Sequence, residues 1–407
     1  MAILFALLGL LVTVSRAHAE LDQPWPRHTI DNRSRGADGV RLADANGDGL
    51  QDIVTGWEEA GVVRLYLNPG PDKSKDKWPA VTVGKAGNVE DAVMVDLDQD
   101  GAIDVVSSCE GKTKTMYVHW GPKDKSKLLD EGAWATEAIP ATAGLQQWMY
   151  CLPMQVDARR GVDLVVGSKN KGASVGWLES PANPRDLKTW TYHKICNAGW
   201  IMSLEPAFDP DVAPATILVT DRKGEHRGTY LMRFTRSGAQ PEWHQTTIEL
   251  GQAEYMFASY NRTGRRLAVA TRDGAIRVFD RLNAFSAAES GKRFDVTGVP
   301  NPFNITHGKA VAWGKIDEDE HADLVVSFNT QGQHGKPGVS WIKVDPDKDP
   351  KDWRAFNIAG LEGKKFDRIE LIDLDNDGDL DVLTCEEADN LGVVWYENPR
   401  GPRADNP

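Results

Sequence analysis

One acidic motif recurs three times and limits the possible folds more than any other feature of the chain. It reads DANGDGLQD at residues 44–52, DLDQDGAID at residues 96–104 and DLDNDGDLD at residues 373–381. Two apolar residues that open a strand follow each copy. Oxygen-bearing side chains at alternate positions of a tight loop, with Gly at the turn, form a site that suits a hard cation such as calcium.

The expected calcium ligands occupy positions 1, 3, 5 and 9 of each copy. In chain order they are Asp44, Asn46, Asp48 and Asp52; Asp96, Asp98, Asp100 and Asp104; and Asp373, Asp375, Asp377 and Asp381. An EF-hand is excluded, because position 12 is Thr or Ser instead of Glu and a β-branched segment follows instead of a helix. A metal-free hairpin turn is the alternative for any single copy. The threefold recurrence of one spacing favours three calcium sites.

Two further copies of the motif are degenerate. The copy at residues 315–323 has Lys at position 1 and Glu in place of the Gly, so it is a weaker site. Its remaining acids are Asp317, Asp319 and Asp323. The copy at residues 155–163 has Arg159 at position 5, and we expect this guanidinium to take the place of a cation.

Two other strand patterns recur with the acidic motif, at a period of 52 to 59 residues. One resembles G-x-V-x-W-Y-x-N-P, and the other begins with Trp and alternates to Ile or Val, as at residues 78–83 and 134–139. Seven units of four strands predict an all-β, seven-bladed β-propeller. The last unit lacks its Trp strand, whereas an additional copy stands at residues 25–30. We therefore expect the N-terminal strand to complete the last blade and to remove the free edge.

The two ends of the chain differ from the repeats. Residues 2–14 are an apolar run, too short to cross a bilayer, and Ala-His-Ala precedes Glu20. This pattern predicts a signal peptide at residues 1–19, a propeller at 20–399 and a disordered tail at 400–407. A secreted or periplasmic location follows, with no transmembrane segment after cleavage.

The amino-acid composition limits the kinds of ligand and the disulfides that we expect. The chain has 60 acidic and 47 basic residues and a formal net charge of −13, which argues against nucleic acid as a ligand. Four cysteines in an exported chain allow two disulfides, and Cys109–Cys151 or Cys151–Cys196 are the pairs considered.

The motif D-x-D/N-x-D-G-x-x-D, followed by two apolar residues, resembles the FG-GAP/VCBS repeats of integrin-α-like seven-bladed propellers. The resemblance extends over nearly the whole chain after residue 19 and implies this fold and bound calcium. It does not specify an activity, because such repeats occur in adhesion proteins, sugar-binding proteins and some polysaccharide lyases.

The face opposite the calcium loops is the expected ligand site. Its loops follow the second and outer strands, and they divide into an acidic arc and a basic arc. The residues are Asp38, Glu58, Glu110, Asp367 and Glu386 on the acidic side, and Lys169, Arg222, Arg272 and Lys309 on the basic side. Opposed charges around a funnel suit a polar ligand such as a carbohydrate; ordinary solvated loops are the alternative.

The candidate catalytic residues on this face are histidines and tyrosines. The candidates are His226, His307 and His334 as general base, with Tyr150 or Tyr255 as acid in β-elimination from a uronic acid. For each isolated His, an ordinary surface loop residue is the favoured interpretation. We therefore expect a calcium-binding interaction module for carbohydrate or a secreted protein partner. The alternative is an enzyme, a polysaccharide lyase or sugar dehydratase.

Overall fold

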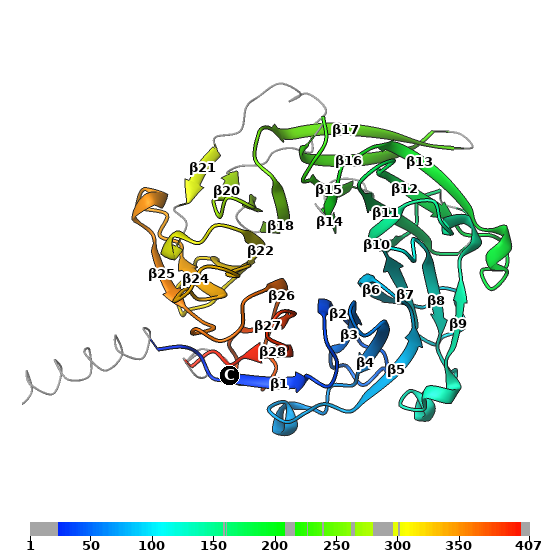
Figure 1. Cartoon of the computed structure of the whole chain (residues 1–407), viewed down its shortest axis with the longest axis horizontal. Coiled ribbons are helices and arrows are strands. Elements are labelled where there is room, and N and C mark those ends of the chain that lie inside the picture. Colours follow the sequence, from blue (N-terminus) through cyan, green and yellow to red (C-terminus); the bar gives the residue numbers. More distant parts are fainter. Residues whose placement is uncertain are drawn as a thin grey trace, which may run out of the picture.

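The computed structural model of the chain is a closed ring of seven antiparallel sheets, each with four strands (Figure 1). It describes residues 23–157, 159, 161–207, 216–225, 227–237, 240–261, 265–279, 296–299 and 302–399. In every blade the first strand faces the central channel and the last strand lies at the circumference (Figure 1). The prediction of a seven-bladed, all-β propeller is confirmed.

Six blades follow the chain in order. They are β2 (Ala37–Ala43), β3 (Asp52–Trp57), β4 (Val62–Tyr66), β5 (Ala80–Lys85); β6 (Val89–Val95), β7 (Asp104–Cys109), β8 (Met116–Trp120), β9 (Ala135–Ala138); β10 (Gln147–Met154), β11 (Asp163–Lys169), β12 (Ser174–Glu179), β13 (Thr191–Asn197); β14 (Ile201–Pro206), β15 (Thr216–Asp221), β16 (Gly228–Ser237), β17 (Gln240–Leu250); β18 (Tyr255–Asn261), β19 (Arg266–Thr271), β20 (Ile276–Phe279), β21 (Val296–Val299); and β22 (Gly308–Gly314), β23 (Asp323–Phe328), β24 (Val339–Lys343), β25 (Arg354–Asn357). Short 3-10 turns precede several outer strands, among them η1 (Pro71–Lys73), η3 (Glu131–Ala133), η5 (Leu187–Thr189) and η8 (Pro350–Asp352).

Blade 7 joins the two ends of the described chain. Its order is β26 (Phe366–Ile372), β27 (Asp381–Glu386), β28 (Gly392–Tyr396) and then β1 (Arg27–Asp31), which pairs antiparallel with β28. Nε2 of His28 lies 2.7 Å from Oε2 of Glu397, and the amide of Glu397 donates to the carbonyl of Pro26 at 2.9 Å. The prediction that an N-terminal strand completes the last blade is therefore confirmed.

The ninth residue of the acidic motif is a buried structural anchor. The carboxylate of Asp52 accepts hydrogen bonds from the amides of Ala45 and Asn68, both at 2.8 Å, so it ties the hairpin to the end of the third strand. Asp163 and Asp323 of the degenerate copies accept the corresponding bond from the residue after their third strand. A buried amide without a partner is costly, which explains why this Asp persists where the cation ligands do not.

The repeated Trp residues stabilise the outer edge of the blades. Trp78, Trp134 and Trp190 are buried, and each indole N–H donates to a carbonyl of the loop before its strand, at 2.9–3.0 Å. This role in packing matches their regular spacing along the chain.

The cysteines do not form the disulfides considered from the sequence: all four are free thiols. Cys109, Cys151 and Cys385 lie in three different hydrophobic clusters, so the walls of the blades keep their side chains apart. Cys196 is only partly buried, on β13.

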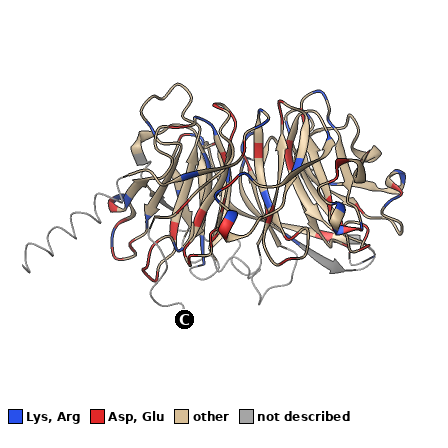
Figure 2. Cartoon of the chain, turned by 90° about the horizontal axis from the view of Figure 1, so that it is seen from below, with Lys and Arg blue, Asp and Glu red and all other residues tan. Residues whose placement is uncertain are grey.

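The expected signal peptide at 1–19 and tail at 400–407 lie outside the described residues. Within the part of the chain that the structure describes, no helix has the length and apolar character needed to cross a membrane. Seen from the edge, the ring is a flat disc with charged residues on both loop-bearing faces (Figure 2).

Candidate functional site

Two positions of the blade register build the wall of one cavity at the mouth of the central channel. In every blade the sixth residue of the second strand pairs with a residue of the inner strand. On each of these two strands, the next residue along the chain faces the channel. We call the channel-facing residues of the inner strands the inner ring, and those at the ends of the second strands the outer ring. Together the two rings form the funnel. The inner ring is Asp38, Glu90, Met149, Met202, Met256, Lys309 and Asp367. The outer ring is Glu58, Glu110, Lys169, Arg222, Arg272, Asn329 and Glu387.

The funnel encloses a cavity of about 330 Å³, lined by the whole inner ring and by six residues of the outer ring. This volume lies within the range of small-molecule sites. The structure thus brings together eight of the nine residues expected in the funnel. They are Asp38, Glu58, Glu110, Lys169, Arg222, Arg272, Lys309 and Asp367.

Glu386 is the exception, and the expectation that it faces the funnel is wrong. It is fully buried, and its carboxylate accepts hydrogen bonds from the amides of Lys364, Lys365 and Leu391, among others. Side chains alternate between the two faces of a strand, so the next residue, Glu387, takes the funnel position.

The two halves of the funnel have different chemistry. On blades 7, 1 and 2, every residue of both rings is acidic. We call the six carboxylates of this side the acidic half: Asp38, Glu58, Glu90, Glu110, Asp367 and Glu387. On blades 3 to 5, Met149, Met202 and Met256 make an apolar wall, and the outer ring is Lys169, Arg222 and Arg272. We call this side the basic half.

Ion pairs mark the boundaries between the halves. Lys169 contacts Glu90 at 2.6 Å and also Glu110, and Lys309 contacts Asp367 at 2.6 Å. The positive charges of two of the four expected basic residues, Lys169 and Lys309, are therefore neutralised by carboxylates of the neighbouring acidic blade.

The remaining positive charge gathers around Trp200. The guanidinium of Arg222 lies 4.5 Å from the ring centroid, and the ammonium of Lys223 lies 4.6 Å from it. Glu254 accepts a hydrogen bond from Arg222 at 2.6 Å and lies 3.6 Å from Arg272. Arg222 and Arg272 thus share one carboxylate, and with Lys223 beside Trp200 this part of the funnel is positively charged.

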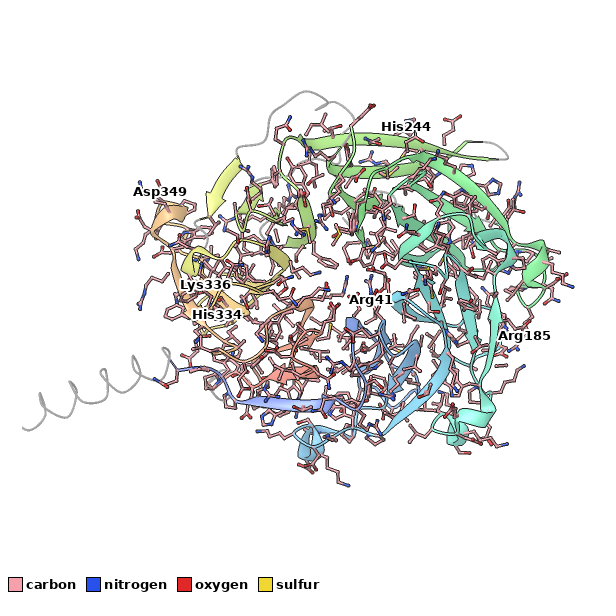
Figure 3. All side chains as sticks on the ribbon, in the orientation of Figure 1. Arg41, Arg185, His244, His334, Lys336 and Asp349 are labelled. Atoms are coloured by element: carbon pink, nitrogen blue, oxygen red, sulfur yellow. The ribbon has the colours of Figure 1, made fainter. Side chains whose placement is uncertain are left out.

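The catalytic candidates are dispersed. His307 and Tyr150 line the cavity, and burial together with Arg272 and Arg222 lowers the pKa of His307. Tyr255 is fully buried in the core, and His334 is exposed on blade 6, away from the centre of the ring (Figure 3). His226 lies outside the described residues.

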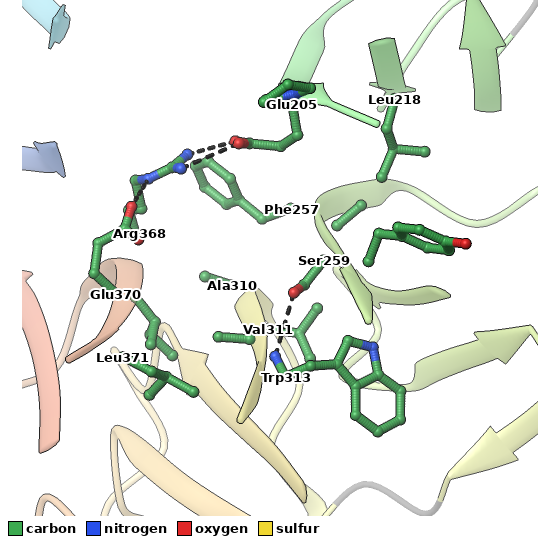
Figure 4. A pocket seen from close by; sticks show the side chains of 15 residues that line it. Glu205, Leu218, Phe257, Ser259, Ala310, Val311, Trp313, Arg368, Glu370 and Leu371 are labelled. Atoms are coloured by element: carbon green, nitrogen blue, oxygen red, sulfur yellow. Dashed lines mark hydrogen bonds and ion pairs between the residues drawn. The ribbon is translucent and has the colours of Figure 1, made fainter. Parts of the chain in front are cut away.

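Below the funnel, ion pairs join side chains of the inner strands. Arg41 makes two hydrogen bonds to Asp91, at 2.9 and 3.0 Å, while Arg368 makes two to Glu205 and one to Glu370. Beyond them lies a second cavity of about 310 Å³. Phe257, Val311 and Leu371 form part of its wall, and the Glu205–Arg368–Glu370 cluster forms its polar edge (Figure 4).

The acidic hairpins lie on the opposite face and differ in how well they suit a cation. In blade 7 the carboxylates of Asp373, Asp375 and Asp381 converge within 4.8 Å. Oδ1 of Asp375 and both carboxylate oxygens of Asp379 are buried without a hydrogen-bond partner in the described structure. Asp379 stands at position 7 of the motif, outside the four expected ligand positions. Carboxylate oxygens without a hydrogen-bond partner, in a loop that contains five Asp residues, suit a hard cation.

In blade 2, Asp96, Asp98 and Asp104 also converge within 4.8 Å, but Arg185 contacts Asp98 and Asp100. In blade 1 the carboxylate of Asp44 is occupied by the amides of Gly47, Asp48 and Gly49.

The two degenerate hairpins contain internal cations. In blade 6, Lys343 contacts Asp317 and lies 2.9 Å from Asp319. In blade 3, Arg159 lies 3.6 Å from Asp157 and 2.9 Å from Glu179.

Comparisons with known proteins agree with this architecture. Residues 44–107 match the model of the FG-GAP-like repeat family. The β-propeller domain of Myceliophteria thermophila Cps50 (Swd1) superposes with a TM-score of 0.56 at 11% identity, covering 91% of this chain and 100% of that one. BBS1N, solved in complex with ARL6DN, superposes with a TM-score of 0.51 at 12% identity, covering 93% and 100%. Comparison with curated proteins gives no significant match.

At such low identity the two structures establish the fold alone. The closed ring and its funnel define a β-propeller interaction module. Residues 44–107 in blades 1 and 2 are therefore FG-GAP-like, and the acidic hairpin of that repeat recurs in blade 7 of the propeller.

Proposed function

We propose that this protein is an exported, calcium-stabilised propeller that binds an acidic carbohydrate in its funnel. The observation that carries the proposal is the basic half, where Arg222 and Arg272 stand above Met149, Met202 and Met256 at the edge of one cavity. Guanidinium groups bind carboxylates with directed, charge-assisted hydrogen bonds. The methionines offer an apolar surface to the C–H faces of a sugar ring.

Calcium has a separate structural role in this proposal. The blade 7 hairpin supplies converging carboxylates in the blade that closes the ring, and the blade 2 hairpin supplies a second set, both on the face away from the ligand. Export is consistent with the apolar N-terminal segment and with the calcium available outside the cytoplasm.

The test is binding of purified protein to acidic and neutral polysaccharides in calcium, by calorimetry and gel retardation. We expect an acidic polysaccharide such as polygalacturonate to bind and a neutral glucan not to bind. Arg272→Ala should weaken binding about 10- to 100-fold, the effect of one charged hydrogen bond. Arg35→Ala, with a side chain 67% exposed outside the funnel, should have no effect. Equal retention of acidic and neutral polymers would refute the proposal.

A lyase is the second candidate, because His307 and Tyr150 line the same cavity. A neutral His307 would take the proton from the carbon next to a uronic carboxylate, and Tyr150 would protonate the leaving oxygen. The test is the appearance of unsaturated sugar ends, followed by ultraviolet absorbance. Binding without such products would leave the binding module and reject the lyase.

A further inference from the structure

Two buried polar groups that line the funnel have no hydrogen bond to the described residues: Asp38 in the acidic half, and Tyr150 on β10 of the adjoining blade 3. The carboxylate of Asp38 lines the cavity, although the residue is 92% buried. The hydroxyl of Tyr150 lines it as well, and that residue is 94% buried. Both residues are more than nine-tenths buried and line the cavity, so a donor on a bound ligand would complete hydrogen bonding that the described residues do not supply.

The surroundings of Asp38 specify the sign of the missing group. The carboxylates of Asp38, Asp367 and Glu387 lie within 4.8 Å of one another, as do those of Glu58, Glu90 and Glu110. Burial and the neighbouring acids Asp367 and Glu90 raise the pKa of Asp38 well above its usual value. Among the described residues, the ion pairs to these six carboxylates come from Lys169, Lys309 and Lys365. The acidic half therefore has a deficit of positive charge.

The same funnel provides an example of what satisfies such a cluster. The ammonium of Lys169 lies between Glu90 and Glu110 and 4.6 Å from the ring centroid of Trp200. An ammonium donates three hydrogen bonds, and a second one at Asp38 would bind the free carboxylate while leaving the lysine pairs in place. A divalent cation is less suitable there, because it requires several carboxylate oxygens that Lys309 and Lys365 already contact.

We propose that the acidic half of the funnel is a subsite for a primary ammonium group, anchored by Asp38 and Tyr150. Since this inference rests on the proposed function, the ligand becomes a dipolar saccharide with both a carboxylate and an unacetylated amine. Its carboxylate binds Arg222 and Arg272, its amine binds Asp38, and the hydroxyl of Tyr150 accepts a further N–H. A cavity of about 330 Å³ holds a saccharide unit of this size.

The test compares four small probes by calorimetry in calcium: muramic acid, which has both groups; N-acetylmuramic acid, in which the amine is capped; glucuronic acid; and glucosamine. We expect muramic acid to bind at least tenfold more tightly than N-acetylmuramic acid. Asp38→Asn should abolish this ratio without weakening N-acetylmuramic acid, and Tyr150→Phe should reduce it. Glu59→Gln, which alters an exposed carboxylate outside the funnel, is the matched control.

The outcomes separate the two proposals. If the acidic probes bind but the free amine adds nothing, the ammonium subsite is refuted and the acidic-carbohydrate module stands. If no acidic probe or polymer binds, both proposals fail. If Asp38→Asn instead lowers the calcium stoichiometry by one, the cluster is a metal site and the ammonium subsite is refuted. Because Asp38 lies among like charges, we expect Asp38→Asn to fold and to unfold at an equal or higher temperature.

Discussion

Glu205 on β14 and Arg368 on β26 are 163 residues apart in the chain, yet two hydrogen bonds of 2.6 and 3.2 Å join them across the central channel. Burial would raise the pKa of Glu205, but Arg368 and Arg41 hold it below its usual value. The pair connects blade 4 with blade 7, so it links distant parts of the ring that share no strand pairing.

Breaking this pair should destabilise the ring. We expect Glu205→Gln to lower the free energy of unfolding by about 2 kcal/mol, because Arg368 then loses a charged acceptor in a partly desolvated channel. Urea denaturation measures the change. The exposed pair Asp349–Lys351 is the control, and Lys351→Ala should leave the free energy of unfolding essentially unchanged. Equal effects of the two substitutions would contradict a role for the channel pair.

Closure of the ring depends on β1. A chain that starts at Arg33 should melt at a lower temperature and self-associate, because β28 loses its hydrogen-bonded neighbour and presents a free edge. A chain that starts at Gln23 keeps β1 and should remain unchanged. Light scattering after size-exclusion chromatography distinguishes the two, and a monomeric, equally stable short chain would show that closure by β1 is dispensable.

Calcium should stabilise the propeller mainly through blade 7. At a hundredfold excess over the dissociation constant, one site adds about 2.7 kcal/mol to the free energy of unfolding. We expect the double substitution Asp375→Asn and Asp377→Asn to remove most of the calcium-dependent shift in melting temperature. Asp157→Asn in the degenerate blade 3 hairpin should leave that shift in place. No calcium response in the unaltered protein would reject the metal site.

His119 should make the protein sensitive to acid. It is fully buried between the hydroxyls of Ser107 and Thr136, and burial lowers its pKa from 6.5 to about 3. Below pH 6.5 the unfolded chain takes up a proton that the folded protein does not. Stability contributed by this residue is therefore lost as pH falls from 6.5 to about 3, by about 1.4 kcal/mol per unit.

His119→Gln should flatten this part of the stability curve, measured by urea denaturation at several pH values. His244 is exposed on β17, and His244→Gln should leave the slope as it is (Figure 3). A pH dependence that is identical in all three proteins would place the acid sensitivity elsewhere.

Thiol labelling should separate the cysteines. The native protein should react slowly with Ellman's reagent at Cys196 and not at Cys109, Cys151 or Cys385, whose side chains are at most 1% exposed. Under denaturing conditions without reductant, four thiols should react. Two thiols under those conditions would demonstrate a disulfide and contradict the structure.

The periodic features of the sequence predict the fold because each of them acts within one blade. Strand alternation, the acidic hairpin and the outer Trp satisfy local packing and hydrogen-bonding needs that repeat every 50 to 59 residues, counted between the starts of the second strands. The displaced strand at residues 25–30 likewise has only one place in a closed ring. Register within a blade is less visible: Glu386 and Glu387 look alike in sequence, and only strand pairing decides which of them faces the channel.

Sequence alone therefore determined the seven blades, their closure, the acidic hairpins and most members of the funnel, because these follow from local periodicity. The tertiary structure decided which charges meet. Lys169 pairs with Glu90 and Glu110, Arg368 reaches Glu205, and Asp38 remains without a partner. Such pairings depend on distances between side chains of different blades, which strand patterns do not encode, and they govern the charge that the funnel offers to a ligand.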